Sequence, residues 1–107
     1  MKIEEIQTWE KSFSERKGIS DDYEKALKIA TLKLGEEVGE VYKAILEKEW
    51  DEVLLECVDV LVFITKIANI MEKHHNTEKF SDVIKKKIDY SETRTYNSEI
   101  NKFDKPV

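Results

Sequence analysis

Two groups of carboxylates stand at helical spacing in the middle of the chain. The first lies in the segment GEEVGE and the second in ECVD, with fifteen residues between them; the acids are Glu36, Glu37, Glu40, Glu56 and Asp59. Residues three or four apart share one face of a helix, so each group presents its acids together. If the two helices pack antiparallel, all of these acids can converge. Buried, unpaired carboxylates repel each other or take up protons, and a divalent cation relieves both costs.

The donor types restrict the cation. All of the acids offer oxygen, and the only histidines, His74 and His75, lie more than a dozen residues beyond Asp59. Oxygen-only sites suit Mg²⁺, Mn²⁺ or Ca²⁺. A di-iron bundle would need Glu-x-x-His pairs on its helices, and the sequence has none. Because Mg²⁺ usually shares its shell with substrate phosphates, the pattern favours hydrolysis of a phosphate ester or anhydride.

Each acidic group also has an explanation without a metal. The first group could lie on a solvated helix face and pair with Lys33 or Lys43. The second group lies within VLLECVDVLVFI, Val53–Ile64, which offers no polar face. It could instead form a structural ion pair with Lys66 or with a lysine of a second subunit. The alternatives therefore differ in whether these acids bind a metal ion, pair with a lysine or face solvent.

Helical periodicity covers most of the chain. Charged residues make up 38%, with three glycines and one proline, a composition typical of helical proteins. The apolar spacing predicts helices at about residues 3–16, 22–48, 51–73 and 77–88. The third is apolar on nearly every side, so other helices or a second subunit should cover it, with Cys57 buried as a small hydrophobe. Gly35 and Gly39, inside the second helix, are expected where helices pack closely.

These elements predict an all-α fold, a helical bundle of about four helices that is completed by dimerisation. The length predicts a single domain over residues 1–107, with a polar C-terminal tail from about residue 89. A net charge of −5 argues against a nucleic-acid binder, and the N-terminus has no apolar stretch typical of a signal peptide. Val53–Ile70 carries too many charges for a membrane span. With a single cysteine, the chain suits the reducing cytosol, so we expect a cytoplasmic protein.

The acidic pattern resembles that of the MazG-like nucleotide pyrophosphohydrolases, a branch of the all-α NTP pyrophosphatases. The matching segments are LKLGEEVGEVYKAI at Leu32–Ile45 and ECVDVLVFITKIAN at Glu56–Asn69. A weaker match is KIDYSETRTY, where this chain has Ser91 at a position that often holds Asn in the family. The likeness extends from about Trp9 to Tyr96. It implies a helical enzyme that works as a homodimer or homotetramer and acts on phosphoric anhydrides.

The resemblance also implies a role for each site residue. By position, the ligands of Mg²⁺, which Mn²⁺ could replace, would be Glu37, Glu40, Glu56 and Asp59. Glu36 would share the catalytic role with Glu37, by holding a further Mg²⁺ or by orienting the attacking water. The phosphates would meet Lys87, Arg94 and a further candidate, Lys33, whose charges suit that role.

The implied reaction is the Mg²⁺-dependent hydrolysis of (deoxy)nucleoside triphosphates to the monophosphate and pyrophosphate. Members of the family range from broad housecleaning enzymes to selective dUTP or dCTP hydrolases. Two alternatives remain at the level of the sequence. The first is a non-catalytic dimerising adaptor, which need not bind Mg²⁺. The second is a hydrolase of another pyrophosphate, such as phosphoribosyl-ATP.

Overall fold

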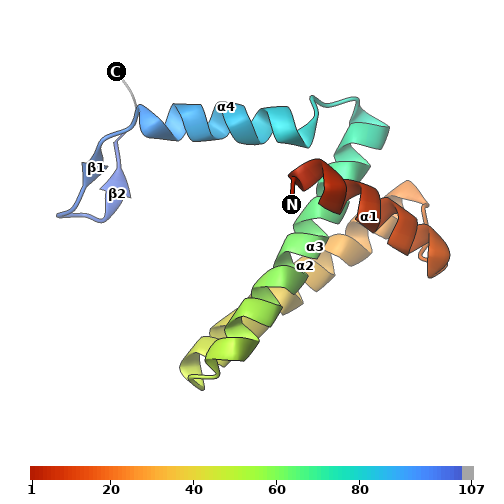
Figure 1. Cartoon of the computed structure of the whole chain (residues 1–107), viewed down its shortest axis with the longest axis horizontal. Coiled ribbons are helices and arrows are strands. Elements are labelled where there is room, and N and C mark those ends of the chain that lie inside the picture. The colour runs from red at the N-terminus through yellow and green to blue at the C-terminus, as the bar shows by residue number, and fades with distance from the viewer. Residues whose placement is uncertain (105–107) are drawn as a thin grey trace. The chain divides into compact units, whose positions relative to one another are not determined.

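The computed structural model describes residues 1–104 and confirms the all-α fold. Its elements are α1 (Ile3–Arg16), α2 (Tyr23–Leu46), α3 (Trp50–His75), α4 (Phe80–Glu92), β1 (Tyr96–Asn97) and β2 (Lys102–Phe103). The chain forms two compact units (Figure 1). The helical unit is Met1–Thr77, and the C-terminal unit begins at Glu78. In the part of the chain that the structure describes, no helix is long and apolar enough to span a membrane.

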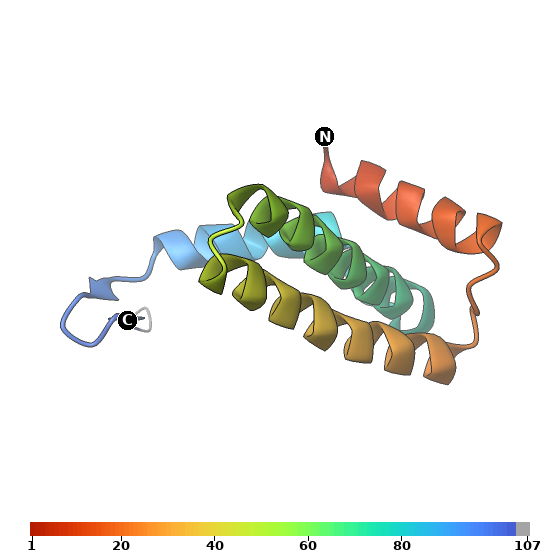
Figure 2. The same cartoon turned by 90° about the horizontal axis from the view of Figure 1, so that it is seen from below.

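The helices α2 and α3 form an antiparallel pair, which Figures 1 and 2 show side by side. Asp22 caps the start of α2 by accepting a hydrogen bond from the backbone N–H of Lys25 at 3.1 Å. Only residues 47–49 separate the two helices. Lys48 takes a positive φ of 59° there, and the N–H of Glu49 returns to the carbonyl of Ala44 at 3.0 Å, which closes the turn. These contacts form a helical hairpin whose two long helices are joined by a short turn.

Small side chains let the two long helices approach each other. Ala26, Ala30 and Ala44 of α2 are buried. On α3, Thr65 is completely buried, and its hydroxyl donates to the carbonyl of Leu61 at 2.8 Å. This pairing leaves the core of the helical unit narrow. Most of its apolar side chains are therefore half-buried or exposed.

The expected cover of α3 is incomplete within one chain. Leu54, Leu55 and Val58 are exposed by 70%, 58% and 54%. Cys57 is exposed as well, so its predicted burial is wrong for the single chain, because α1 and α2 cover only part of α3. The described residues also leave open space beside the two glycines of α2: a Cβ at Gly35 or Gly39 would meet nothing within 4 Å, so close packing there is not seen. Dimerisation stays a prediction.

The first helix crosses the C-terminal half of α3 (Figure 1). Hydrogen bonds between polar side chains join the two helices there. Gln7 and Glu10 of α1 are buried, with 7% and 3% exposure, and so is Asn69 of α3, with 5%. On another face of α1, Trp9 and Phe13 stack with ring centroids 4.8 Å apart. The fully buried residues of α1 are thus polar, and they contact α3 through hydrogen bonds.

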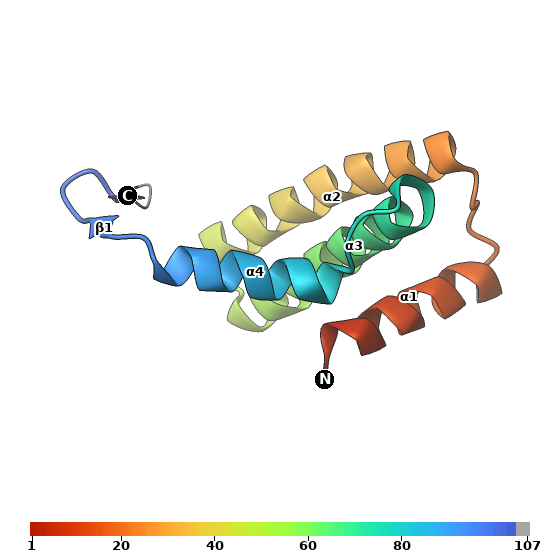
Figure 3. The same cartoon turned by 90° about the horizontal axis from the view of Figure 1, so that it is seen from above.

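The C-terminal unit consists of α4, which Figure 3 shows together with β1, and a small antiparallel hairpin of β1 and β2. The polar tail expected from about residue 89 begins with the last turn of α4. It continues into β1 and β2, in which Tyr96 pairs with Phe103. Residues 105–107 of that predicted tail lie outside the described residues. Aromatic side chains of the tail meet across the two short strands. The ring centroids of Tyr96 and Phe103 lie 5.0 Å apart, and such cross-strand pairs stabilise a hairpin.

Candidate metal centre

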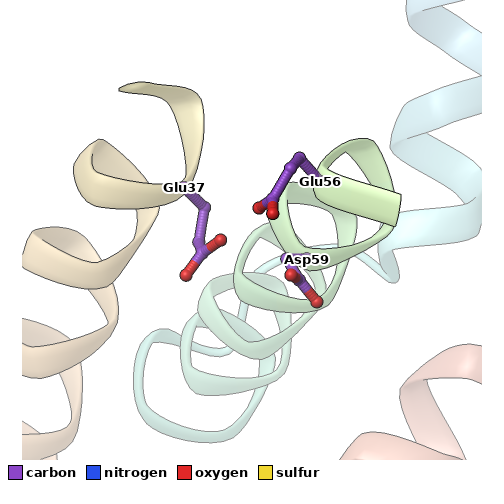
Figure 4. Close-up of side chains that lie close together, drawn as sticks. All are labelled: Glu37, Glu56 and Asp59. Atoms are coloured by element: carbon purple, nitrogen blue, oxygen red, sulfur yellow. The ribbon is translucent and has the colours of Figure 1, made fainter. Parts of the chain in front are cut away.

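Three of the five acids singled out in the sequence converge between α2 and α3. Carboxylate oxygens of Glu37, Glu56 and Asp59 all lie within 4.8 Å of one another. Figure 4 shows Glu37 reaching from α2 towards Glu56 on α3, with Asp59 one turn farther along α3. We call these residues the carboxylate cluster. Glu37 and Glu56 are half-buried, while Asp59 is exposed.

The helical hairpin explains this convergence. Glu37 stands between Leu34 and Val38, which are half-buried on the side of α2 that meets α3. Glu56 and Asp59 are three apart and so share a face of α3. Antiparallel pairing with a three-residue turn then places the middle of α2 opposite the first part of α3. The acids meet because Glu37 precedes the turn by about as many residues as Glu56 and Asp59 follow it.

The charges in the carboxylate cluster are not compensated within the described residues. Oxygen Oε2 of Glu56 is buried and has no hydrogen-bond partner in residues 1–104. Partial burial raises the pKa of Glu56 above its usual value of 4.5. A hydrogen bond shared with Glu37, and the negative charges of Glu37, Asp59 and Glu40, raise this pKa further. The carboxylate cluster therefore favours either a shared proton or a cation.

The residues of the carboxylate cluster fit a hard divalent cation. Each offers a carboxylate oxygen, the donor that Mg²⁺, Mn²⁺ and Ca²⁺ prefer. Ligand oxygens lie about 2.0–2.6 Å from Mg²⁺ or Ca²⁺, so two of them can be about 4–5 Å apart across the ion. The 4.8 Å limit on the oxygens of the cluster is compatible with that span. A cation would also give the buried Oε2 of Glu56 the partner it lacks among residues 1–104.

The other two acids of α2 lie outside this group of three. Glu40 is exposed, but it is near enough for its charge to raise the pKa of Glu56. The side chain of Glu36 is 61% exposed and pairs with Lys33 at 3.1 Å. The pairing of Lys33 with the acids, one of the two roles considered for it, is therefore formed. Its role towards phosphates stays a prediction, as does the catalytic role of Glu36.

The ion pair between the second acidic group and Lys66, one of the two metal-free alternatives, is not formed. The Nζ of Lys66 lies 3.3 Å from Oε2 of Glu10 on α1, and both side chains are largely buried. Lys66 is therefore committed to α1 rather than to Glu56 or Asp59. A lysine from a second subunit is not tested by a single chain.

The two remaining candidate phosphate ligands belong to the C-terminal unit. The ammonium of Lys87 lies 4.8 Å from the ring centroid of Tyr90. The guanidinium of Arg94 donates to the carbonyls of Phe103 and Asp104 at 3.0 and 3.1 Å, which ties the hairpin to the end of α4. Both residues thus have structural contacts within their own unit, and their roles towards phosphates stay predictions.

The sequence reasoning missed the polar residues that join α1 to α3. We call Gln7, Glu10, Ser14, Lys66 and Asn69 the α1–α3 network. The spacing of the three α1 residues, four or fewer apart, places them on one helix face. In the sequence, that pattern is indistinguishable from the solvated face of an amphipathic helix. Only the docking of α1 shows that these polar groups are buried.

The match to a family model agrees with this geometry. Residues 26–97 match the model described as the MazG nucleotide pyrophosphohydrolase domain. The match includes the carboxylate cluster and the α2–α3 hairpin that forms it. Neither the curated proteins nor the solved structures gave a match to the chain. Because the family model covers more than half of the sequence, the chain belongs to the MazG nucleotide pyrophosphohydrolase family.

Proposed function

We propose that the protein hydrolyses (deoxy)nucleoside triphosphates to the monophosphate and pyrophosphate, in a reaction that depends on Mg²⁺. The observation that carries this proposal is the convergence of Glu37, Glu56 and Asp59 with one buried carboxylate oxygen unpartnered among residues 1–104. Membership in the MazG family supports an activity on nucleotide pyrophosphates.

Each acid has a distinct part in the proposed site. Glu37, Glu56 and Asp59 would hold Mg²⁺, and the exposed Glu40, whose charge acts on Glu56, would be a further ligand. A divalent cation bound there supplies positive charge to the phosphate oxygens and to the attacking water. The half-buried position of Glu37 and Glu56 limits competing water, which strengthens these electrostatic interactions.

The reaction is the hydrolysis of a phosphoric anhydride. The water oxygen forms a bond to the α- or the β-phosphorus, the bond from that phosphorus to the bridging oxygen breaks, and the bridging oxygen leaves with the other product, so that the monophosphate and pyrophosphate are released. Glu36 orients this water and accepts its proton, a role for which its carboxylate is accessible. Lys33, which pairs with Glu36 at 3.1 Å, binds a phosphate oxygen when the substrate enters, a role that its positive charge suits.

Two features of the proposal involve regions beyond the carboxylate cluster. Lys87 and Arg94 bind phosphates from the C-terminal unit. The exposed apolar side chains of α3, including Leu54, Leu55 and Val58, pack against a second copy in a homodimer or homotetramer. An adaptor would use the same apolar face, so dimerisation alone does not separate it from an enzyme. Binding of Mg²⁺ does.

The test is pyrophosphate release from a panel of canonical and modified nucleoside triphosphates, with Mg²⁺ and with EDTA. Asp59→Asn serves as the site variant. Asp51→Asn, on an exposed acid near the start of the same helix, makes the same chemical change as a matched control. We expect Mg²⁺-dependent release that is lost only in the first variant.

Other results would redirect the assignment. Folded protein that binds Mg²⁺ but releases no pyrophosphate from any nucleoside triphosphate would contradict the proposed substrate and favour another pyrophosphate, such as phosphoribosyl-ATP. Folded protein that neither binds Mg²⁺ nor hydrolyses any nucleotide would favour the adaptor.

A further inference from the structure

A pocket of about 950 Å³ lies in the helical unit beside the α1–α3 network. Its lining includes Glu10, Ser14, Lys66 and Asn69 from the network, together with Ile70 of α3. It contains none of the three residues of the carboxylate cluster. Pockets that hold small molecules span about 300–1,000 Å³, so a nucleoside fits in this one.

The wall of this pocket is an ordered set of buried polar groups. The amide nitrogen of Asn69 donates to Oε1 of Glu10 at 2.8 Å and to the backbone carbonyl of Gln7 at 3.1 Å. The amide nitrogen of Gln7 donates to Oδ1 of Asn69 at 2.9 Å. Ser14 donates to Oε2 of Glu10. Because each group fixes the next, the wall is rigid before any ligand enters.

One donor in this wall is left for a ligand. Nζ of Lys66 donates to Oε2 of Glu10 at 3.3 Å and to the hydroxyl of Ser14 at 3.0 Å. An ammonium has three hydrogens, so these bonds within the described residues use two of them. The side chain of Lys66 keeps 14% exposure, and it lines the pocket. Its remaining hydrogen can therefore serve a ligand that carries an acceptor oxygen.

The charges around the pocket favour an uncharged ligand. The acidic lining residues are Glu10, Glu15, Asp21 and Glu72, and the lysines are Lys11, Lys66 and Lys73. The two signs nearly balance, and the most buried lysine already faces a carboxylate. Such a lining offers a phosphate no net attraction. It suits a neutral polar group next to the apolar surfaces of Ile19 and Ile70.

The position of the pocket along α3 relates it to the carboxylate cluster. Lys66 follows Asp59 by seven residues, which is close to two full helical turns, so both lie on nearly the same face of α3. At 1.5 Å per residue they are about 10 Å apart along the helix axis. This distance is comparable to the separation between the phosphates and the base of a nucleotide. Phe63, half-buried, occupies the intervening turn of the same face.

We propose that this pocket binds the base of the nucleotide substrate while the phosphates lie at the carboxylate cluster, an inference that rests on the proposed function. Lys66 donates to a ring carbonyl of the base, and the network of Glu10, Ser14 and Asn69 holds its ammonium in place. The pocket thereby favours bases that carry a carbonyl, such as uracil and guanine, over adenine, which has none.

The first test compares kcat/KM for UTP, GTP and ATP in the full-length protein. Lys66→Met alone would leave Glu10 buried without its cation, so the test variant is Glu10→Gln/Lys66→Met, which keeps the network neutral. Lys28→Met, on an exposed lysine of α2, is the matched control. We expect the wild type and the control to favour UTP and GTP over ATP by about tenfold or more. The double variant should lose this preference, because its kcat/KM for UTP and GTP should fall towards the value for ATP.

The second test measures binding without phosphates or metal. Uridine and adenosine are titrated in EDTA into ¹⁵N-labelled protein, and the side-chain amide of Asn69 and the backbone amides of Ser14 and Gly18 are followed by NMR. Uridine should shift these signals at lower concentration than adenosine, and only in proteins that retain Lys66. This readout is independent of catalysis and of a purely structural role for the network.

The outcomes separate this inference from the proposed function. Hydrolysis of nucleoside triphosphates with an unchanged base preference in the double variant, and no shifts at the pocket, would overturn the inference alone. Shifts at the pocket without any hydrolysis would support a nucleoside site and contradict the proposed activity. A protein that shows neither would contradict both.

Discussion

The carboxylate cluster and the α1–α3 network are both partly buried groups of polar side chains on α3, yet their charges are arranged in opposite ways. In the network, Glu10 meets Lys66 at 3.3 Å, and the amides around them complete the hydrogen bonding. In the carboxylate cluster, three acids share one sign, and Oε2 of Glu56 has no partner in residues 1–104. The comparison teaches that the network balances its own charges as folded, whereas the cluster favours a proton or a cation taken from solution.

The largest expected effect is on activity, at Asp59 in the carboxylate cluster. Asp59→Asn removes one charged ligand oxygen and should lower the Mg²⁺-dependent kcat/KM by about a thousandfold, equivalent to about 4 kcal/mol of transition-state stabilisation. Steady-state pyrophosphate release measures this change. Asp51→Asn should remain within a factor of two or so of the wild type. Activity that survives in Asp59→Asn would remove this residue from the site.

The next effect, on stability, lies in the α1–α3 network. Lys66→Met leaves the carboxylate of Glu10, which is 5% exposed, without its cation. Loss of one partner of a buried pair should lower the free energy of unfolding by about 3 kcal/mol, which urea denaturation monitored by circular dichroism can measure. Glu10→Gln/Lys66→Met should recover much of the loss, since it leaves no unpaired charge. Equal stability of the wild type and the single variant would show that the pair is not effectively buried.

The third effect is the stabilisation of the protein by Mg²⁺, which should depend on the carboxylate cluster and not on the α1–α3 network. Mg²⁺ at a hundredfold excess over its Kd should stabilise the wild type by about 2.7 kcal/mol, because it binds the folded state selectively. Thermal unfolding with Mg²⁺ and with EDTA measures the shift in Tm. Glu56→Gln/Asp59→Asn should lose the shift, whereas Glu10→Gln/Lys66→Met should retain it. A shift that persists after the carboxylate cluster is changed would place the metal elsewhere.

The smallest effect concerns the pH dependence of stability without metal. The pKa of Glu56 in the folded protein is raised above its usual value of 4.5, so between these two values the folded state binds more protons than the unfolded state. Stability in EDTA should therefore fall as the pH rises from about 4.5 through the raised pKa. Glu56→Gln should reduce this slope, as measured by urea midpoints across that pH range. An identical slope in the variant would assign the titration to other groups.

Sequence periodicity predicted the helices well because their apolar spacing is regular. The first predicted helix, residues 3–16, has the bounds of α1, and the predicted helices at 22–48 and 51–73 differ from α2 and α3 by a few residues at their ends. The last, 77–88, is displaced relative to α4, which begins at Phe80 and continues to Glu92. Helix ends depend on local capping, for which periodicity gives little information.

Within the site, spacing predicted which acids share a face but not how the faces are oriented. Glu37, Glu56 and Asp59 converge as expected, whereas Glu36 lies on the exposed side and pairs with Lys33. The partner of Lys66 could not be predicted either, since Glu10 is far from it in the sequence and the angle of α1 across α3 decides the contact. Long-range pairings of this kind depend on packing that a sequence pattern does not specify.

The three-residue turn between α2 and α3 has a consequence for the order of folding. Residues close along the chain find each other quickly, since little chain entropy is lost on closing a short loop. The acids at Glu37 and Glu56 are joined by the hairpin itself, whereas Glu10 and Lys66 come from segments far apart in the chain. The α2–α3 hairpin therefore brings the like charges of Glu37 and Glu56 together before the pair of Glu10 and Lys66 forms.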